Sequence, residues 1–299
     1  MWYLIIAFFI FLIFLYICLQ IAFTLVLPKT VSLEQSLQNE KSKEESLISF
    51  YETRLSKQKL IKSRYGYNIM LYYMINHKNN KFVVIAHGHT YTHHGAIKYA
   101  KIMDELGYNV IMYDQRYHGL SGGKNCSLGY YEKYDLYDII TLVYEEFGDD
   151  IYLGTYGESM GGATVLLEQV LDERIDFVIS DCSFSSLNKL VKEQLKLKHV
   201  PGFVLFFVGI FFKIITGVKM KEVKPIESVM NSMKPIMFVH GKQDKLIDYH
   251  HSEEMYNIHK GKKKLYIASG NAFHAQSYFS NPKDYFENVR NFLEEISYK

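Results

Sequence analysis

Gly157-Glu158-Ser159-Met160-Gly161 reads Gly-x-Ser-x-Gly and separates a strand-like run from a helical pattern. The run at 150–156 is short, apolar and aromatic, which is typical of a strand. Apolar residues at 163–171 then recur at helical spacing. Glycines two residues to either side of Ser159 permit a strained, closely packed turn that presents its hydroxyl at the positive end of a helix. The stretch therefore predicts a nucleophilic serine, with an ordinary glycine-flanked turn as the alternative.

Strand-like and helical patterns alternate on both sides of this turn. Strands are expected at 82–86, 110–113, 177–180, 236–239 and 265–267, and helices at about 95–106, 130–147, 249–259 and 282–296. A hairpin of 60–63 with 68–75 precedes them. The strand at 82–86 is continuously apolar, as expected of a strand buried on both faces. The alternation predicts a mostly parallel, doubly wound α/β sheet with helices on both faces.

The N-terminal run from Met1 to Leu27 contains no charged side chain and is long enough to cross a hydrocarbon core of about 30 Å as a helix. Because it is longer than a signal-peptide core and lacks a basic n-region and a cleavage site, we expect an uncleaved anchor over 1–28. A polar linker or helical neck at 29–48 and the main domain at 49–299 follow. Lysines follow the span and none precedes it, which favours a cytoplasmic domain.

The alternation breaks at about 183–233, where helical patterns continue without a clear strand. We expect an inserted helical cap over the carboxyl edge of the sheet, where such folds bind ligands. The cap contains the very apolar run 203–212, which is too short to span a membrane. Two interpretations of this run remain open. It packs the core of the cap, or it forms an acyl-chain pocket or a surface that dips into lipid.

A base and an acid for Ser159 are expected in loops that follow later strands. A serine hydroxyl needs a base to take its proton, and a carboxylate that holds the base in place. Asp244 and His274 follow the last two expected strands, and the chain order serine, aspartate, histidine is the one this fold requires. Asp181, after the preceding strand, is the rival acid. Asp248 lies near the start of a helix and suits capping better.

A tetrahedral oxyanion also needs preorganised hydrogen-bond donors. The backbone N–H of Met160, directly after the nucleophile, is expected to supply one. The second is expected from the loop after strand 82–86, where Gly88 permits a tight turn and the N–H of His89 is the candidate.

Composition and spacing argue against several other classes of protein. The net charge of +2 and the apolar share of 48% favour neither disorder nor nucleic-acid binding. The three cysteines, Cys18, Cys126 and Cys182, are too scattered for a disulfide framework or a zinc site. Four histidines lie close together, at His87, His89, His93 and His94. No matching carboxylate or cysteine cluster accompanies them, so structural roles are favoured over metal binding.

Several motifs occur in the order found in α/β-hydrolases: His87-Gly88, 114–123, Gly157 to Gly162, 240–244 and His274. From about residue 50 onward, the chain most resembles monoacylglycerol lipase-like, serine aminopeptidase-like and Bem46-like members, including membrane-anchored bacterial hydrolases. The resemblance implies a Ser/Asp/His triad, no cofactor, and hydrolysis of esters, thioesters or amides. Two departures, at Tyr117 and at 270–274, concern loop shape and remove no reacting group.

The resulting hypothesis is a membrane-tethered serine hydrolase of acyl esters, with lipid-like substrates favoured by the anchor and the apolar cap. A peptidase or amidase on the same triad is the nearest alternative. It needs acidic residues for the amine of its substrate, for which Glu193, Glu222 and Glu227 are candidates. A non-catalytic binding protein is a third interpretation, disfavoured because every reacting group is present. The oligomeric state is left open.

Overall fold

A computed structural model describes residues 2–297 and contains one eight-stranded sheet. The strands are β1 (Lys57–Lys62), β2 (Asn68–Met74), β3 (Lys81–Ala86), β4 (Asn109–Tyr113), β5 (Tyr152–Glu158), β6 (Phe177–Asp181), β7 (Ile236–Gly241) and β8 (Lys263–Ala268). Their order across the sheet is β1-β2-β4-β3-β5-β6-β7-β8. Strand β2 runs antiparallel to β1 and β4, and the other neighbours are parallel. The predicted hairpin and mostly parallel sheet are confirmed.

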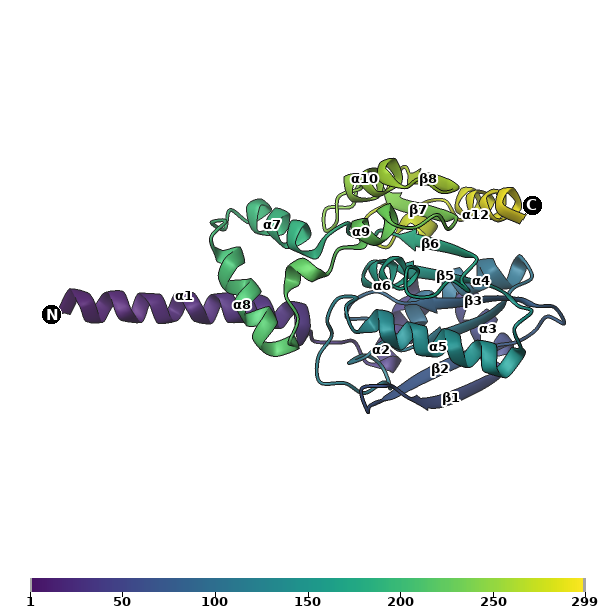
Figure 1. Ribbon diagram of the computed structural model, residues 1–299, viewed down its shortest axis with the longest axis horizontal. Coiled ribbons are helices and arrows are strands. Elements are labelled where there is room, and N and C mark those ends of the chain that lie inside the picture. Colours follow the sequence, from purple (N-terminus) through teal and green to yellow (C-terminus); the bar gives the residue numbers. More distant parts are fainter. Residues whose placement is uncertain (1, 298–299) are drawn as a thin grey trace.

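Helices cover both faces of this sheet (Figure 1). The larger ones in the main domain are α3 (Glu45–Arg54), α4 (Ile97–Glu105), α5 (Glu132–Phe147), α6 (Met160–Glu168), α10 (His250–Ile258) and α12 (Pro282–Ser297). Shorter turns are η1 (His93–Ala96) and α11 (Ser277–Ser280). One core lies between the sheet and α3, α4 and α12, and a second core lies between the sheet and α5, α6 and α10.

Strand β3 explains why its sequence is apolar at successive positions. Val83 and Ile85 point into one core, whereas Phe82, Val84 and Ala86 point into the other. Because successive side chains of a strand alternate between the two faces, a strand covered on both sides needs apolar residues throughout.

The cap lies between β6 and β7, as expected, and consists of α7 (Leu187–Leu197), α8 (Val204–Thr216), η2 (Met220–Glu222) and α9 (Pro225–Met230). Figure 1 shows α8 beside the second half of the N-terminal helix α1 (Trp2–Val26). On α8, Val208 and Phe212 are buried in the cap core, whereas Phe206 and Ile214 are 67% and 71% exposed. One face of α8 therefore packs in the core of the cap, as the first interpretation expects, and the other face is apolar and exposed.

Among residues 2–297, α1 is the one helix long and apolar enough to cross a membrane. The segment 29–48, for which a linker or a helical neck was expected, forms α2 (Leu33–Lys43) and the beginning of α3. Helix α2 packs on the main domain. Its Ser36 is fully buried, and the Ser36 hydroxyl lies 2.7 Å from Nδ1 of His94. Polar residues that look solvated in the sequence are thus bonded to the loop after β3.

Candidate active site

The turn that carries Ser159 is strained and closely packed. Ser159 lies between β5 and α6 with φ 54° and ψ −113°, a conformation that residues other than glycine rarely adopt. A Cβ atom on Gly157 would lie 2.1 Å from the carbonyl oxygen of Gly161. A Cβ atom on Gly161 would lie 2.1 Å from the carbonyl oxygen of Ala86. The two glycines are therefore required for the close approach of β5, α6 and β3, as the sequence predicted.

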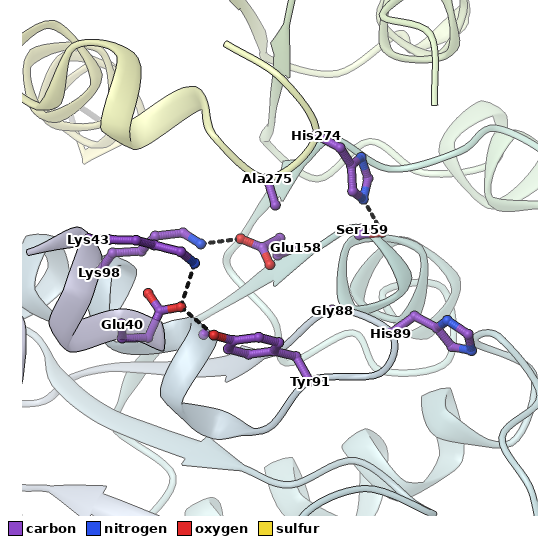
Figure 2. Close-up of a pocket in the computed structure, with 11 residues that line it drawn as sticks. Glu40, Lys43, Gly88, His89, Tyr91, Lys98, Glu158, Ser159, His274 and Ala275 are labelled. Atoms are coloured by element: carbon purple, nitrogen blue, oxygen red, sulfur yellow. Dashed lines mark hydrogen bonds and ion pairs between the residues drawn. The ribbon is translucent and has the colours of Figure 1, made fainter. Parts of the chain in front are cut away.

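Ser159, His274 and Asp244 form a hydrogen-bonded series. The Ser159 Oγ atom lies 2.9 Å from His274 Nε2, and His274 Nδ1 lies 2.6 Å from Asp244 Oδ2. In Figure 2 the His274 ring points directly at Ser159. The three residues meet because β5, β7 and β8 are parallel, so the loops after these strands lie at the same edge of the sheet. The structure thus brings together the three residues that the sequence singled out.

The surroundings of Asp244 keep its carboxylate charged. Its Oδ1 atom accepts hydrogen bonds from the N–H groups of Leu246 and Ile247, both at 2.9 Å. Burial raises the pKa of Asp244, but hydrogen bonds from His240, His274 and the backbone outweigh burial and hold the pKa well below its usual range. A charged Asp244 fixes His274 with its proton on Nδ1 and leaves Nε2 to face the serine.

The two rival acids contact other groups. The Asp181 side chain is fully buried and lies 3.0 Å from the Tyr99 hydroxyl, 2.9 Å from the Tyr285 hydroxyl and 3.1 Å from Oγ of Ser277. Asp248 accepts a hydrogen bond from the backbone N–H of His250 at 3.0 Å, at the start of α10. Asp181 therefore belongs to a cluster with Tyr99 and Tyr285, and Asp248 accepts a hydrogen bond from the first N–H of α10, although Tyr249 occupies the N-cap position.

The two residues expected to supply oxyanion donors, Met160 and His89, line the same cavity as Ser159. Met160 is the first residue of α6 and is buried. Figure 2 shows the chain at Gly88 and His89 passing beside Ser159, with the His89 ring turned away. Burial lowers the pKa of His89 to about 4, so its ring is neutral at pH 7. The Nε2 atom of this ring lies 2.9 Å from the carbonyl oxygen of Leu25 in α1.

The histidines of this loop are engaged by protein groups. His87 Nε2 accepts a hydrogen bond from the N–H of Gln115 at 2.9 Å. His93 lies 2.9 Å from Asp114, and His94 bonds to Ser36. These contacts fit the structural roles that the sequence favoured, because the ring nitrogens hold the loop against its neighbours.

Ser159 lies where two cavities of opposite character meet. The larger, of about 520 Å³, is lined mainly by apolar side chains of α1 and α7 and by Phe184, Leu246 and Ile247. The smaller, of about 180 Å³, is lined by polar and charged residues: Glu40, Lys43, Tyr91, Lys98, Glu158 and His274. Figure 2 shows this polar cavity with Ser159 at its rim.

The charges of the polar cavity are mostly paired. Lys98 is buried and forms an ion pair with Glu158, the residue directly before the serine. One oxygen of Glu40 bonds to Lys43 at 2.6 Å and to the Tyr91 hydroxyl at 2.8 Å. The other, Oε2, is buried and has no hydrogen-bond partner among the described residues. Sequence reasoning missed Glu40 and Lys43, because nothing in a polar segment indicates that it folds over a pocket.

Three acidic residues, Glu193, Glu222 and Glu227, were candidates for binding the amine of a peptide substrate. None of them is among the described residues that line the two cavities. Glu193 bonds to His251 at 2.9 Å. Glu222 accepts a hydrogen bond from the N–H of Lys219, and Glu227 pairs with Lys224. Of the two acidic residues that line the polar cavity, Glu40 has a buried oxygen without a partner, and Glu158 bonds to Lys98 and Tyr99 through Oε2 alone.

Comparison with known proteins identifies the family to which the chain belongs. Residues 77–179 match the family described as serine aminopeptidase, S33. The chain is 35% identical over 242 residues to the uncharacterised protein YqkD of Bacillus subtilis (strain 168), covering 80% of this chain and 79% of the relative. This chain belongs to the α/β-hydrolase superfamily. The hydrolase is also 23% identical over 188 residues to lysophosphatidylserine lipase ABHD12 of Rattus norvegicus.

The match to the mammalian lipase covers 60% of the hydrolase and 46% of the lipase, so the hydrolase spans about half of that relative. Solved structures share the fold. The esterase Pf2001 of Pyrococcus furiosus superposes with a TM-score of 0.67 at 20% identity, over 84% of the hydrolase and 94% of the esterase. Est1E of Butyrivibrio proteoclasticus, solved with ferulic acid, has a TM-score of 0.62 at 18% identity, over 81% and 100%.

Proposed function

We propose that this hydrolase cleaves acyl esters of lipid-like, amphiphilic molecules, with Ser159, His274 and Asp244 as its catalytic triad. The observation that carries the proposal is the position of Ser159, which is hydrogen-bonded to His274 and lies between an apolar and a polar cavity. An amphiphilic ester has the same division at its scissile bond, with an apolar acyl chain on one side and a polar alcohol on the other.

In this mechanism His274 Nε2 takes the proton of Ser159 as Oγ attacks the ester carbonyl carbon. The N–H groups of Met160 and His89 hold the oxyanion, and the loss of one such donor typically costs about 10²–10³ in rate. Asp244 stabilises the imidazolium, which then protonates the departing alcohol. Water, deprotonated by His274, attacks the acyl-enzyme and releases the carboxylic acid.

The comparisons support an ester of this kind at a general level, since a lysophosphatidylserine lipase and an esterase are among the similar proteins. The acyl chain is assigned to the apolar cavity and the alcohol to the polar one. The polar cavity carries two cations, Lys43 and Lys98, and two carboxylates, Glu40 and Glu158, so its charges balance. A neutral polar alcohol, which adds no net charge to the cavity, fits this balance.

A peptidase acting on a free N-terminal amine is the second candidate. The family match to serine aminopeptidases and the two carboxylates that line the polar cavity, Glu40 and Glu158, favour it. Lys43 and Lys98 oppose it, because an ammonium group in the same small cavity would lie close to two cations. The ester is therefore the proposed substrate.

We expect monoacyl esters of polyhydric alcohols to be hydrolysed with a kcat/KM at least about tenfold above that of aminoacyl amides, a difference typical of one well-placed contact. The measurement compares the purified full-length protein on both substrate series in detergent micelles. A kcat/KM that is higher for the amides would favour the peptidase and contradict the ester assignment.

The pH dependence should reflect His274. Burial lowers the pKa of His274, but the hydrogen bond to Asp244 and its negative charge outweigh burial and raise the pKa above the usual 6.5. The imidazole accepts the serine proton only while neutral, so kcat/KM should fall as the pH decreases through this pKa, with a midpoint above 6.5. A pH series on a short-chain nitrophenyl ester measures the midpoint. An acid limb centred below 6.5 would contradict the role of His274 as the base.

We also propose that α1 anchors the hydrolase in a membrane with the domain on the cytoplasmic side. Lys29, Lys41 and Lys43 follow the apolar helix, and an excess of Lys and Arg is typical of the cytoplasmic end of a membrane span. A membrane-impermeant serine-directed probe should then leave Ser159 unlabelled in intact cells and label it after lysis. Equal labelling of intact and lysed cells would place the domain on the outer side of the membrane and contradict the proposed orientation.

A further inference from the structure

We propose that α1 forms one wall of the acyl-binding cavity and that this cavity opens into the bilayer, so that a lipid substrate enters sideways along α1. The inference rests on the proposed function of Ser159. It assigns to α1 a binding role in addition to anchoring, and it identifies residues of α1 that determine which acyl chains fit.

One face of α1 lines the cavity. Ile17, Gln20, Ile21 and Thr24 are spaced three and four residues apart, so they lie on the same side of the helix, facing α7 across the cavity. The wall formed by α7 carries Leu187, Leu190, Val191 and Leu195. Ser159 and Met160 line the same cavity. An acyl chain between α1 and α7 would therefore have its carbonyl end at the serine.

The end of α1 is attached to the main domain next to the reacting groups. The carbonyl oxygen of Leu25 lies 2.9 Å from the His89 ring, and the carbonyl oxygen of Val26 accepts a hydrogen bond from the N–H of Cys126 at 2.9 Å. Cys18 and Ala22 are fully buried against the cap. An anchor on a free tether would have no such contacts. These contacts hold the cavity-lining face of α1 at a defined position relative to Ser159.

The mouth of the cavity lies at a level where the protein surface is apolar. Phe14 of α1 packs against Phe203 and Phe207 of the cap, with ring centroids 5.5 and 5.0 Å apart. Ile17 is one helical turn further along α1, a rise of about 4.5 Å, and is 52% exposed while lining the cavity. The exposed Phe206 of α8, whose ring centroid lies 5.4 Å from that of Phe207, continues the apolar surface next to Phe14. A contiguous apolar surface around a transmembrane helix is what a bilayer covers.

The occupant of the cavity is then the acyl chain of a lipid that is already in the bilayer. A chain that first left the bilayer for water would expose each of its methylene groups, which costs free energy that increases with chain length. Entry between α1 and α7 keeps the chain in apolar surroundings up to Ser159. The polar end of the lipid would remain on the side of Lys43 and Glu40, which belong to the helix that follows the membrane helix.

The first experiment tests the wall. Ile21→Trp places a bulky ring in the cavity, and Ile13→Trp places the same ring on the exposed part of α1, where Ile13 is 60% exposed and outside the cavity. In full-length protein reconstituted in vesicles, Ile21→Trp should lower the ratio of kcat/KM for long-chain over short-chain esters about tenfold or more. Ile13→Trp should leave the ratio unchanged. If this ratio of kcat/KM values were the same in Ile21→Trp and Ile13→Trp, α1 would not form a wall of the acyl-binding cavity.

Two controls keep the outcome clear. Labelling by a short serine-directed probe reports whether Ile21→Trp is folded, and Ile21→Ala, which enlarges the cavity, should shift the preference toward bulkier acyl chains. If Ile21→Trp is not labelled, the chain-length preference of Ile21→Ala alone tests the role of α1. A preference equal to that of the wild type would then contradict this role. If the wild type hydrolyses neither short nor long esters, the proposed function fails. If it hydrolyses both and neither variant changes the ratio, the inference about α1 fails alone.

The second experiment tests the position of the mouth. The chain has one tryptophan, Trp2, so Phe206→Trp in a Trp2→Phe background gives a single fluorophore on α8. Vesicles of phospholipids brominated in their acyl chains should quench this fluorophore. The control, Leu60→Trp, lies on β1 at a position that is 51% exposed, and should not be quenched. If the brominated lipids quenched Phe206→Trp no more than Leu60→Trp, α8 would lie outside the hydrocarbon, and entry of the substrate from the bilayer would be contradicted.

Discussion

Replacing Ser159 with alanine should lower kcat by about 10⁴-fold or more and leave the fold intact. In the proposed mechanism the Ser159 hydroxyl supplies the attacking atom, so its loss should prevent formation of the acyl-enzyme. The change removes one oxygen, and alanine meets the same backbone requirement as serine at φ 54°. The measurements are kcat on a short-chain ester, covalent labelling by a fluorophosphonate probe, and the unfolding temperature of each protein.

A matched control is Ser49→Ala, at an exposed position on α3 that lines neither cavity. It should be labelled as strongly as the wild type, whereas Ser159→Ala should not be labelled at all. Turnover that persists in Ser159→Ala at the wild-type rate would remove Ser159 from the mechanism. A folded wild-type protein that no serine-directed probe labels would favour the non-catalytic binding protein instead.

The second large effect is expected at Asp244. Asp244→Asn should lower kcat by about 10⁴-fold, because an amide stabilises the wrong tautomer of His274 and gives no charge to balance the imidazolium. Asp181→Asn is the matched comparison, since it makes the same change in a buried carboxylate that contacts Tyr99, Tyr285 and Ser277. Its effect on kcat should be far smaller.

Steady-state kinetics of the two variants on one ester separates the candidates for the acid. If Asp181→Asn were the variant that lost turnover while Asp244→Asn retained it, the acid would be Asp181 and the 2.6 Å contact between Asp244 and His274 would be structural. Unfolding temperatures should accompany the rates, because Asp181 is fully buried and its replacement disturbs three hydrogen bonds in the tyrosine cluster.

The turn at Ser159 is a part of the site that the local sequence predicts. A glycine on each side of the serine is required by contacts within a few residues and with the neighbouring strand, so the pattern alone predicts the turn. Asp244 and His274 were predictable for a related reason. Each follows a strand of the parallel sheet, and the carboxyl ends of parallel strands lie at one edge. The backbone donors at Met160 and His89 remain predictions that rest on the same logic.

The contributions of α1 and α2 could not be predicted in this way. Glu40 and Lys43 have the spacing of an ordinary solvated helix, and Ile21 has that of any membrane helix. Their roles depend on contacts with residues far away in the chain, such as Tyr91 for Glu40. The sequence by itself determined the sheet, the serine turn and the order of the candidate triad, because local periodicity and strand order suffice for these. Only the tertiary structure decided which surfaces enclose the serine, because a polar or apolar helix face has the same pattern whether it meets solvent, lipid or a pocket.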